Sequence, residues 1–150
     1  MDARSRVQQQ KSEIMQNLLA LMVSADAPAD QRSQAKNTLR RIGDETLVEP
    51  LGKLVEDSNE DAIVSDCSEV LGFLPVTGQV RTSLVRLLWH DSATVRKSAM
   101  QSLARVGTKD VAAVLAVVIA DCKDAASFFA ADDETLAKRT RNAILGRPLN

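Results

Sequence analysis

The residue types that most often carry catalysis or bind metal are few in this chain: one histidine, His90, and two cysteines, Cys67 and Cys122. Acid–base catalysis by histidine needs a substrate or nucleophile within reach and a group that orients the ring. No serine or cysteine stands at such a spacing, and we expect His90 to satisfy backbone carbonyls at a helix end. We therefore predict no catalytic residue and no enzymatic activity.

The two thiols are far apart and have no histidine cluster beside them, so the sequence supports neither a zinc site nor a disulfide framework. Both cysteines have acidic neighbours that oppose the thiolate, and we expect Cys67 and Cys122 to be small buried hydrophobes. Two acidic clusters, residues 57–61 and 132–134, lack the spacing of a calcium loop and are expected to cap helices. No metal and no cofactor is predicted.

Composition limits the classes of function further. The 150 residues are 45% hydrophobic and 3% aromatic, with a formal net charge of −1. That length supports one domain with a core, whereas near-neutral charge and scarce aromatics argue against a nucleic-acid partner. The longest apolar run, residues 111–120, is too short to span a membrane. With no secretory signal and unpaired thiols, we expect a cytoplasmic protein with a polar, frayed tail over 1–12 and one domain over 13–150.

Four glycines mark the ends of helical stretches: Gly43, Gly72, Gly107 and Gly146 follow apolar residues at spacings of 29, 35 and 39 residues. Glycine tolerates the left-handed conformation that often closes a helix, so each is a candidate C-terminal stop. Four such stops at quasi-regular spacing indicate an internal repeat.

Apolar residues recur at helical spacing in each stretch that ends at one of these glycines, and also in the stretch that precedes it. The broader stripes lie in the first helix of each repeat, as at Leu47, Leu51, Leu54 and Val55, and the second helices are narrower and more polar. Pro50 predicts that its helix begins or kinks near Val48. The pattern predicts an all-α chain of about eight helices in four antiparallel pairs, whose core closes only when neighbouring pairs stack.

Residues 83–107 resemble a HEAT-like repeat. They combine a leucine-rich first helix, Asp91 at the turn, Arg96 at the start of the second helix, and a closing glycine. Residues 50–72 and 31–44 resemble further units, the fourth unit is the weakest, and the similarity covers about 13–146. It implies an α-solenoid of about four HEAT-like helix pairs, nearest to the repeats of phycobilisome lyases. It also implies that Asp91 and Arg96 support each other and the neighbouring repeat.

In similar solenoids the second helices line the concave face. Of the 19 lysines and arginines, eleven lie in or just after the expected second helices: Arg32, Lys36, Arg40, Arg41, Arg96, Lys97, Arg105, Lys138, Arg139, Arg141 and Arg147. Acidic residues interrupt this basic face in the second repeat: Glu60, Asp61, Asp66 and Glu69. A mixed groove suits a protein partner better than a continuous phosphate backbone, although ordinary solvated helix surface remains an equal alternative.

The candidate partner-binding residues are six cations and two aromatics: Arg40, Arg96, Lys97, Arg105, Lys138, Arg141, Phe128 and Phe129. The two phenylalanines lie in an irregular segment, residues 124–132. Aromatic pairs can anchor a partner, but we favour the alternative that an extra short helix here covers the open end of the core.

Three functions follow as expectations. The leading one is a non-enzymatic scaffold or adaptor that binds a protein through the second-helix face. The second, on fold analogy alone, is a bilin lyase-related subunit acting on chromophore attachment to phycobiliproteins. The third is a DNA-binding HEAT-like protein, for which the chain is small and poor in aromatics. The sequence leaves the partner and the oligomeric state open.

Overall fold

The computed structural model describes residues 2–146. This part of the chain contains eight α-helices, two short 3-10 helices and no strand, so the all-α class is confirmed. The bounds are α1 Ala3–Met22, α2 Ala29–Ile42, η1 Glu45–Leu47, α3 Val48–Asp57, α4 Asp61–Leu71, α5 Gly78–Arg86, η2 Leu87–Trp89, α6 Ala93–Val106, α7 Lys109–Cys122 and α8 Ala131–Leu145.

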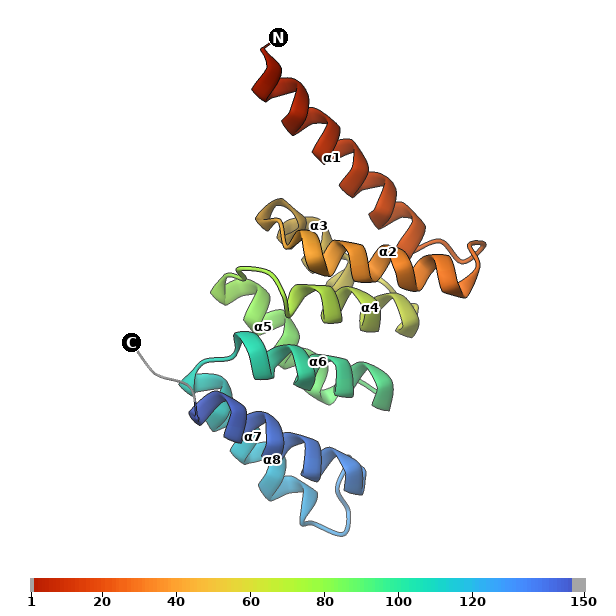
Figure 1. Ribbon diagram of the computed structural model, residues 1–150. Coiled ribbons are helices and arrows are strands. Elements are labelled where there is room, and N and C mark those ends of the chain that lie inside the picture. Colours follow the sequence, from red (N-terminus) through yellow and green to blue (C-terminus); the bar gives the residue numbers. More distant parts are fainter. Residues whose placement is uncertain (1, 147–150) are drawn as a thin grey trace.

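Each odd-numbered helix packs on the even-numbered helix that follows it, which gives four pairs. The even-numbered second helices also pack on one another in chain order, α2 on α4, α4 on α6, and α6 on α8. Figure 1 shows the pairs following one another along the molecule, from the red N-terminal helix to the blue C-terminal helix. Residues far apart in the sequence therefore meet at the seams between successive second helices.

The core is a single cluster of aliphatic side chains contributed by all eight helices. The expected stripes are buried: Leu51 and Val55 on α3 are examples, as are Leu84 and Leu88 in the third pair. Burial of each such side chain contributes about 1.5–3 kcal/mol relative to leaving it exposed. Helix α3 begins at Val48 with Pro50 inside its first turn, as predicted, where a missing N–H costs nothing.

All four predicted glycines follow the last residue of a second helix. Only Gly43 has the left-handed conformation, with φ of 58°, and there the reason for glycine is its backbone. Gly72 has a different reason, because a Cβ built on it would lie 2.9 Å from the Cα of Ser102 on α6. The glycine lets α4 and α6 approach closely.

Small polar residues continue this α4–α6 seam. The hydroxyls of Ser65 and Ser98 are hydrogen-bonded at 2.5 Å, and the hydroxyl of Ser102 donates to the carbonyl of Ser68. Side chains of this size let the two backbones approach, and each buried hydroxyl has a partner. The relative position of α4 and α6 is thus fixed by specific contacts as well as by apolar burial.

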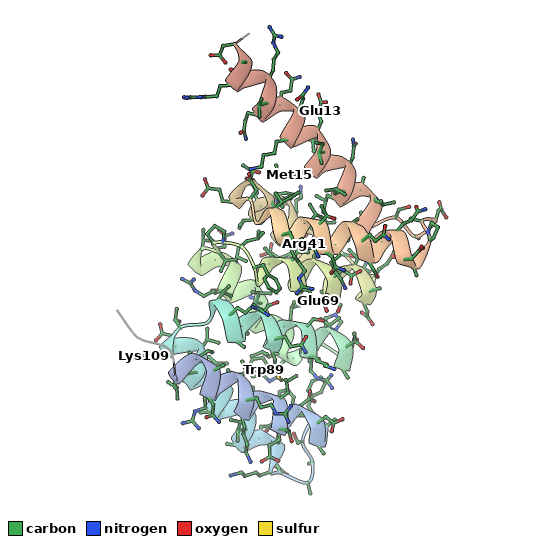
Figure 2. All side chains as sticks on the ribbon, viewed as in Figure 1. Glu13, Met15, Arg41, Glu69, Trp89 and Lys109 are labelled. Atoms are coloured by element: carbon green, nitrogen blue, oxygen red, sulfur yellow. The ribbon has the colours of Figure 1, made fainter. Side chains whose placement is uncertain are left out.

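The expected frayed tail is instead helical. Helix α1 begins at Ala3, and the carboxylate of Asp2 caps it by accepting from the N–H of Ser5 at 2.8 Å. Only Met15 and Met22 of this helix are buried, and the N-terminal half extends past its partner (Figure 1). In Figure 2, Met15 points from α1 toward the helices below it, whereas Glu13 lies on the outer side. The boundary at residue 12 is therefore not a structural one.

Candidate functional site

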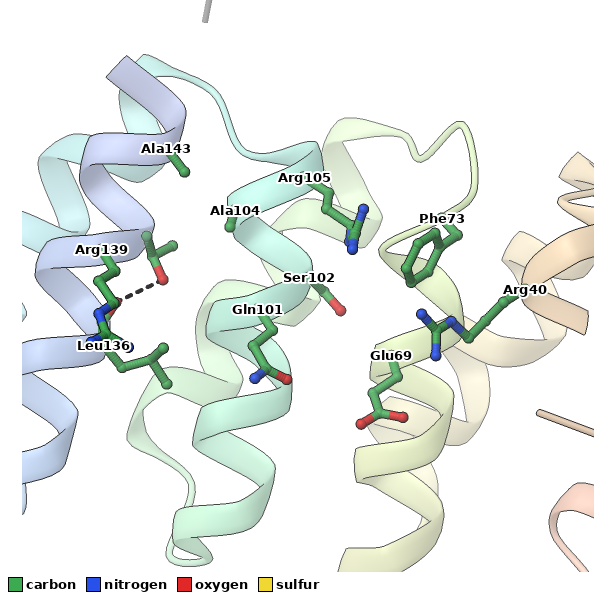
Figure 3. Close-up of a pocket in the computed structure, with 11 residues that line it drawn as sticks. Arg40, Glu69, Phe73, Gln101, Ser102, Ala104, Arg105, Leu136, Arg139 and Ala143 are labelled. Atoms are coloured by element: carbon green, nitrogen blue, oxygen red, sulfur yellow. Dashed lines mark hydrogen bonds between the residues drawn. The ribbon is translucent and has the colours of Figure 1, made fainter. Parts of the chain in front are cut away.

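The second helices share one groove (Figure 3). Its volume is about 500 Å³. The residues that line it come from α2, α6, α8 and the C-terminal end of α4: Arg40, Glu69, Phe73, Gln101, Ser102, Ala104, Arg105, Leu136, Arg139, Thr140 and Ala143. We call this set the second-helix groove.

Four of these residues recur at nearly equal intervals in the sequence, although not at the same position within their helices. Arg40, Phe73, Arg105 and Arg139 are separated by 33, 32 and 34 residues; Phe73 lies just after the end of α4, whereas Arg139 lies within α8. Each is supplied by a different second helix or by the residues just after it. The groove therefore carries a row of side chains that crosses the helices, with one member for each pair.

The ring of Phe73 holds two of these cations. The guanidinium carbon of Arg105 lies 3.9 Å from the ring centroid, and that of Arg40 lies 4.2 Å from it. A cation over an aromatic face contributes about 0.5–1 kcal/mol at an exposed site. Phe73 directly follows Gly72, and its carbonyl packs against Gly43, so the turn that ends α4 positions the ring between α2 and α6.

Glu69, the one acidic residue that lines the groove, and Asp66 on the same helix share a cation. Lys36 on α2 reaches Glu69 at 2.7 Å and Asp66 at 3.2 Å. Partial burial of the Lys36 ammonium works against its charged form, but the carboxylates of Glu69 and Asp66 outweigh it, and the pKa of Lys36 is raised. At Asp66 and Glu69, two of the four acidic residues that interrupt the basic face, a cation from the preceding pair therefore offsets part of the negative charge.

Some of the cations predicted to bind a partner line the groove, and others lie elsewhere on the molecule. Arg40 and Arg105 line the groove, and Lys97 is exposed one turn before Gln101 on the same side of α6. Lys138 and Arg141 do not line it, because they lie on the opposite side of α8 from the lining stripe of Leu136, Arg139, Thr140 and Ala143. Arg147 lies outside the described residues.

Arg96 is not available to a partner, contrary to its place in the predicted binding set. Its side chain is 6% exposed, and Nη2 lies 3.1 Å from Oδ2 of Asp133 on α8. Nη1 donates to the backbone carbonyls of His90 at 2.8 Å and Asp91 at 3.0 Å. A buried guanidinium needs such partners to offset its desolvation. Arg96 supports the turn through the backbone carbonyls of His90 and Asp91, and it supports the next pair through Asp133. Residue Asp91, the partner that the resemblance implied for Arg96, is itself exposed.

The two phenylalanines pack at the contact between the third and fourth helix pairs. Residues 123–130 form turns and bends, so the short helix expected there is absent. Phe129 is buried, with its ring centroid 6.1 Å from that of Trp89 in the third pair. Phe128 is half exposed and lies 5.2 Å from the guanidinium of Arg96. Both rings thus cover the junction of the third and fourth pairs, away from the second-helix groove.

The histidine caps a turn, and the surroundings of both cysteines disfavour the thiolate. Nδ1 of His90 accepts from the N–H of Ser92 at 3.0 Å, so the ring caps a turn through an N–H group and not through carbonyls as expected. Burial, followed by the charge of Asp66, raises the pKa of the Cys67 thiol to about 12. Burial and nearby carboxylates, Asp133 first, also raise the pKa of Cys122. The buried position expected for Cys67 is confirmed.

Residues 2–146 contain no group of three or more histidine, cysteine or acidic side chains that could hold a metal ion. Over the same range, no helix is both long and apolar enough to cross a membrane. A scan against protein-family models and a search of curated proteins gave no match for this chain.

Sequence reasoning missed Phe73 and did not select Arg139 among the candidate residues. A usable signal existed in the spacing of about 33 residues that links Arg40, Phe73, Arg105 and Arg139. It was hidden because the helix-ending glycines recur less regularly, so alignment on the glycines puts both Phe73 and Arg139 out of step with Arg40 and Arg105.

Proposed function

We propose that this chain is a HEAT-like helical-repeat module, an α-solenoid of four pairs, that binds another protein through the second-helix groove. The observation that carries the proposal is the row formed by Arg40, Phe73, Arg105 and Arg139. A row with one side chain from each pair crosses all four pairs, and a long surface of this kind suits an elongated partner.

Two further features support a binding role. The aromatic and arginine side chains in the groove are the types that contribute most to protein interfaces. The seam contacts between α4 and α6, through Ser65, Ser98 and Gly72, hold the groove walls in a fixed relation before any partner arrives. A preformed surface loses less conformational entropy on binding.

The proposal is tested by affinity capture from the native host, with captured proteins identified by mass spectrometry. The groove variant is Arg105→Glu with Arg139→Glu, and the matched control is Lys138→Glu with Arg141→Glu, which makes the same charge change on the far side of α8. Arg96 is left unchanged because it is buried. We expect specific partners to be lost from the groove variant and retained by the control. Equal capture by all three proteins would refute the proposal.

A further inference from the structure

We infer that the second-helix groove binds an extended acidic segment of a partner protein, whose carboxylates pair with Arg40, Arg105 and Arg139. This inference rests on the proposed function and names the chemical class of the partner. It follows from the charge, the spacing and the shape of the groove.

The charge of the groove is positive and in part unneutralised. Among the described residues, no acidic side chain forms an ion pair with Arg40 or Arg139. Nη1 of Arg40 donates to the amide oxygen of Asn37 at 3.5 Å. Glu69, the one acidic residue that lines the groove, is 2.7 Å from Lys36. Carboxylates of a partner would therefore meet arginines without displacing an existing ion pair at these two positions.

The geometry of the cations favours carboxylates as ligands. Phe73 holds the guanidinium groups of Arg40 and Arg105 near its ring, so these two like charges are kept close together before a ligand binds. A planar guanidinium pairs with a carboxylate through two parallel hydrogen bonds. Preorganised cations of this kind give more binding energy than mobile ones, because the side chains lose less freedom.

The spacing of the row favours an extended chain. The guanidinium carbons of Arg40 and Arg105 lie 4.2 Å and 3.9 Å from one ring centroid and are therefore at most about 8 Å apart. Packed helices such as α6 and α8, which carry Arg105 and Arg139, lie about 8–10 Å apart. A polyproline II chain rises about 3.1 Å for each residue and has three residues per turn, so its side chains at every third position share one face at intervals of about 9 Å, and acidic residues at that spacing would face the arginines. Between them, apolar side chains of the peptide would contact Leu136, Ala104 and Ala143 on the groove wall.

The same features disfavour a nucleic acid. A phosphate backbone rewards uninterrupted positive charge, whereas Glu69 and Asp66 place two carboxylates in the middle of this surface. Phe73 already has a guanidinium within 3.9 Å and another within 4.2 Å of its centroid, so its ring is occupied and is not an open platform for a base.

A direct test uses fluorescence anisotropy with a labelled nonapeptide that has glutamate at every third position and leucine and serine between. The comparison probes are the same peptide with glutamine for glutamate, and a labelled DNA duplex. We expect the glutamate peptide to bind at least about tenfold more tightly than the glutamine peptide, and Arg105→Glu with Arg139→Glu to remove that difference. Lys138→Glu with Arg141→Glu, the matched control, should stay within about twofold of the wild type.

Three results of this test would overturn the inference: equal binding of the two peptides, equal losses in the groove variant and the control, or tighter binding of the duplex. Circular dichroism of each variant confirms that it is folded. Light scattering of the protein alone shows whether a second copy occupies the groove; self-association that the groove variant abolishes would also overturn the acidic-segment assignment.

A selection from a random peptide library separates this inference from the proposed function. Enrichment of acidic peptides that depends on Arg105 and Arg139 supports both. Enrichment of basic or purely apolar peptides with the same dependence overturns the acidic class and leaves the groove as a protein-binding site. Enrichment that is unchanged in the groove variant, or no enrichment at all, counts against both.

Discussion

Arg96 shows how a single side chain can join two pairs of helices. Its buried guanidinium donates to the carboxylate of Asp133 and to the backbone carbonyls of His90 and Asp91. Asp133 in turn accepts from the N–H of Ala130 at 2.8 Å and so fixes the start of α8. This one ion pair links the turn before α6 to the N-terminus of α8.

Replacing Arg96 with methionine leaves the Asp133 carboxylate buried without its cation. We predict that Arg96→Met lowers the free energy of unfolding by about 3 kcal/mol, the usual cost of breaking a buried pair from one side. The matched control is Lys97→Met, at the next position and exposed, which should change stability by no more than about 0.5 kcal/mol. Urea unfolding followed by circular dichroism measures both, and similar values for the two variants would show that the buried pair has no such role.

The two cysteines differ in accessibility. Cys67 is fully buried, with a pKa of about 12, whereas Cys122 is only partly buried. Since the thiolate is the reactive form, we predict that a thiol reagent at neutral pH modifies Cys122 slowly and leaves Cys67 unmodified until the protein is unfolded. Mass spectrometry of digested samples locates the label. Equal labelling rates in the folded protein would contradict the buried position of Cys67.

At the scale of elements, the α4–α6 seam is the best-defined contact between pairs. A methyl group on Gly72 would meet the backbone of Ser102, which cannot move without shifting α6. We predict that Gly72→Ala lowers the free energy of unfolding by about 1–3 kcal/mol, the range for overpacking. Gly78→Ala is the control: nothing lies within 4 Å of its Cβ, at the first residue of α5.

For Gly78→Ala we expect no loss, and a gain of up to about 1 kcal/mol, because alanine restricts the unfolded chain. Thermal and urea unfolding of the two variants give the comparison. If Gly72→Ala were as stable as Gly78→Ala, the close approach of α4 and α6 would be wrong.

Helix α1 is tied to the junction of α2 and α3 by an ion pair. Nζ of Lys11 lies 2.8 Å from Oδ2 of Asp44, whose carboxylate also accepts from the N–H of Thr46. The hydrogen bond from Lys11, followed by those from Thr46, lowers the pKa of Asp44 to about 2 from the ordinary 3.8. Because the folded pKa is the lower one, Asp44 stabilises the fold above pH 3.8, and this contribution is lost as the pH falls toward 2.

We predict that Asp44→Asn removes a pH-dependent contribution of about 1 kcal/mol, a small value because Lys11 is half exposed and solvent screens the pair. The stability difference between wild type and variant should be constant above about pH 5 and should decline to its minimum near pH 2. Unfolding by urea across this range measures it. Asp26→Asn, in the loop before α2, is the control, and a difference that does not change with pH would disprove the assignment to Asp44.

At the scale of the whole molecule, the sequence was sufficient to predict the features that depend on local residue patterns. The helices, their pairing along the chain and the stop at Gly43 follow from apolar spacing and backbone preference, which act within a few turns. The other three predicted glycines also follow the last residue of a second helix, but without the left-handed conformation that was expected. The start of α3 near Val48 follows from Pro50 in the same way.

The roles of side chains that the sequence did not predict depend on contacts between helix pairs. Arg96 was selected as a surface cation because its partner, Asp133, is 37 residues away on α8. Phe73 gained its role from arginines on two other helices, and Phe129 from Trp89. Residues 3–12 were expected to be frayed because they lack an apolar stripe, yet the cap at Asp2 and the continuous helix through Met22 order them.

The central claim is that the row from Arg40 to Arg139 forms one binding surface. Backbone amide NMR of the protein, titrated with the nonapeptide that carries glutamate at every third position, tests it most directly. The account predicts that the largest chemical-shift changes occur at Phe73, Gln101, Arg105 and Arg139, on three successive helix pairs. Changes concentrated on α5 and α7, or around Lys138 and Arg141 on the far side of α8, would contradict it.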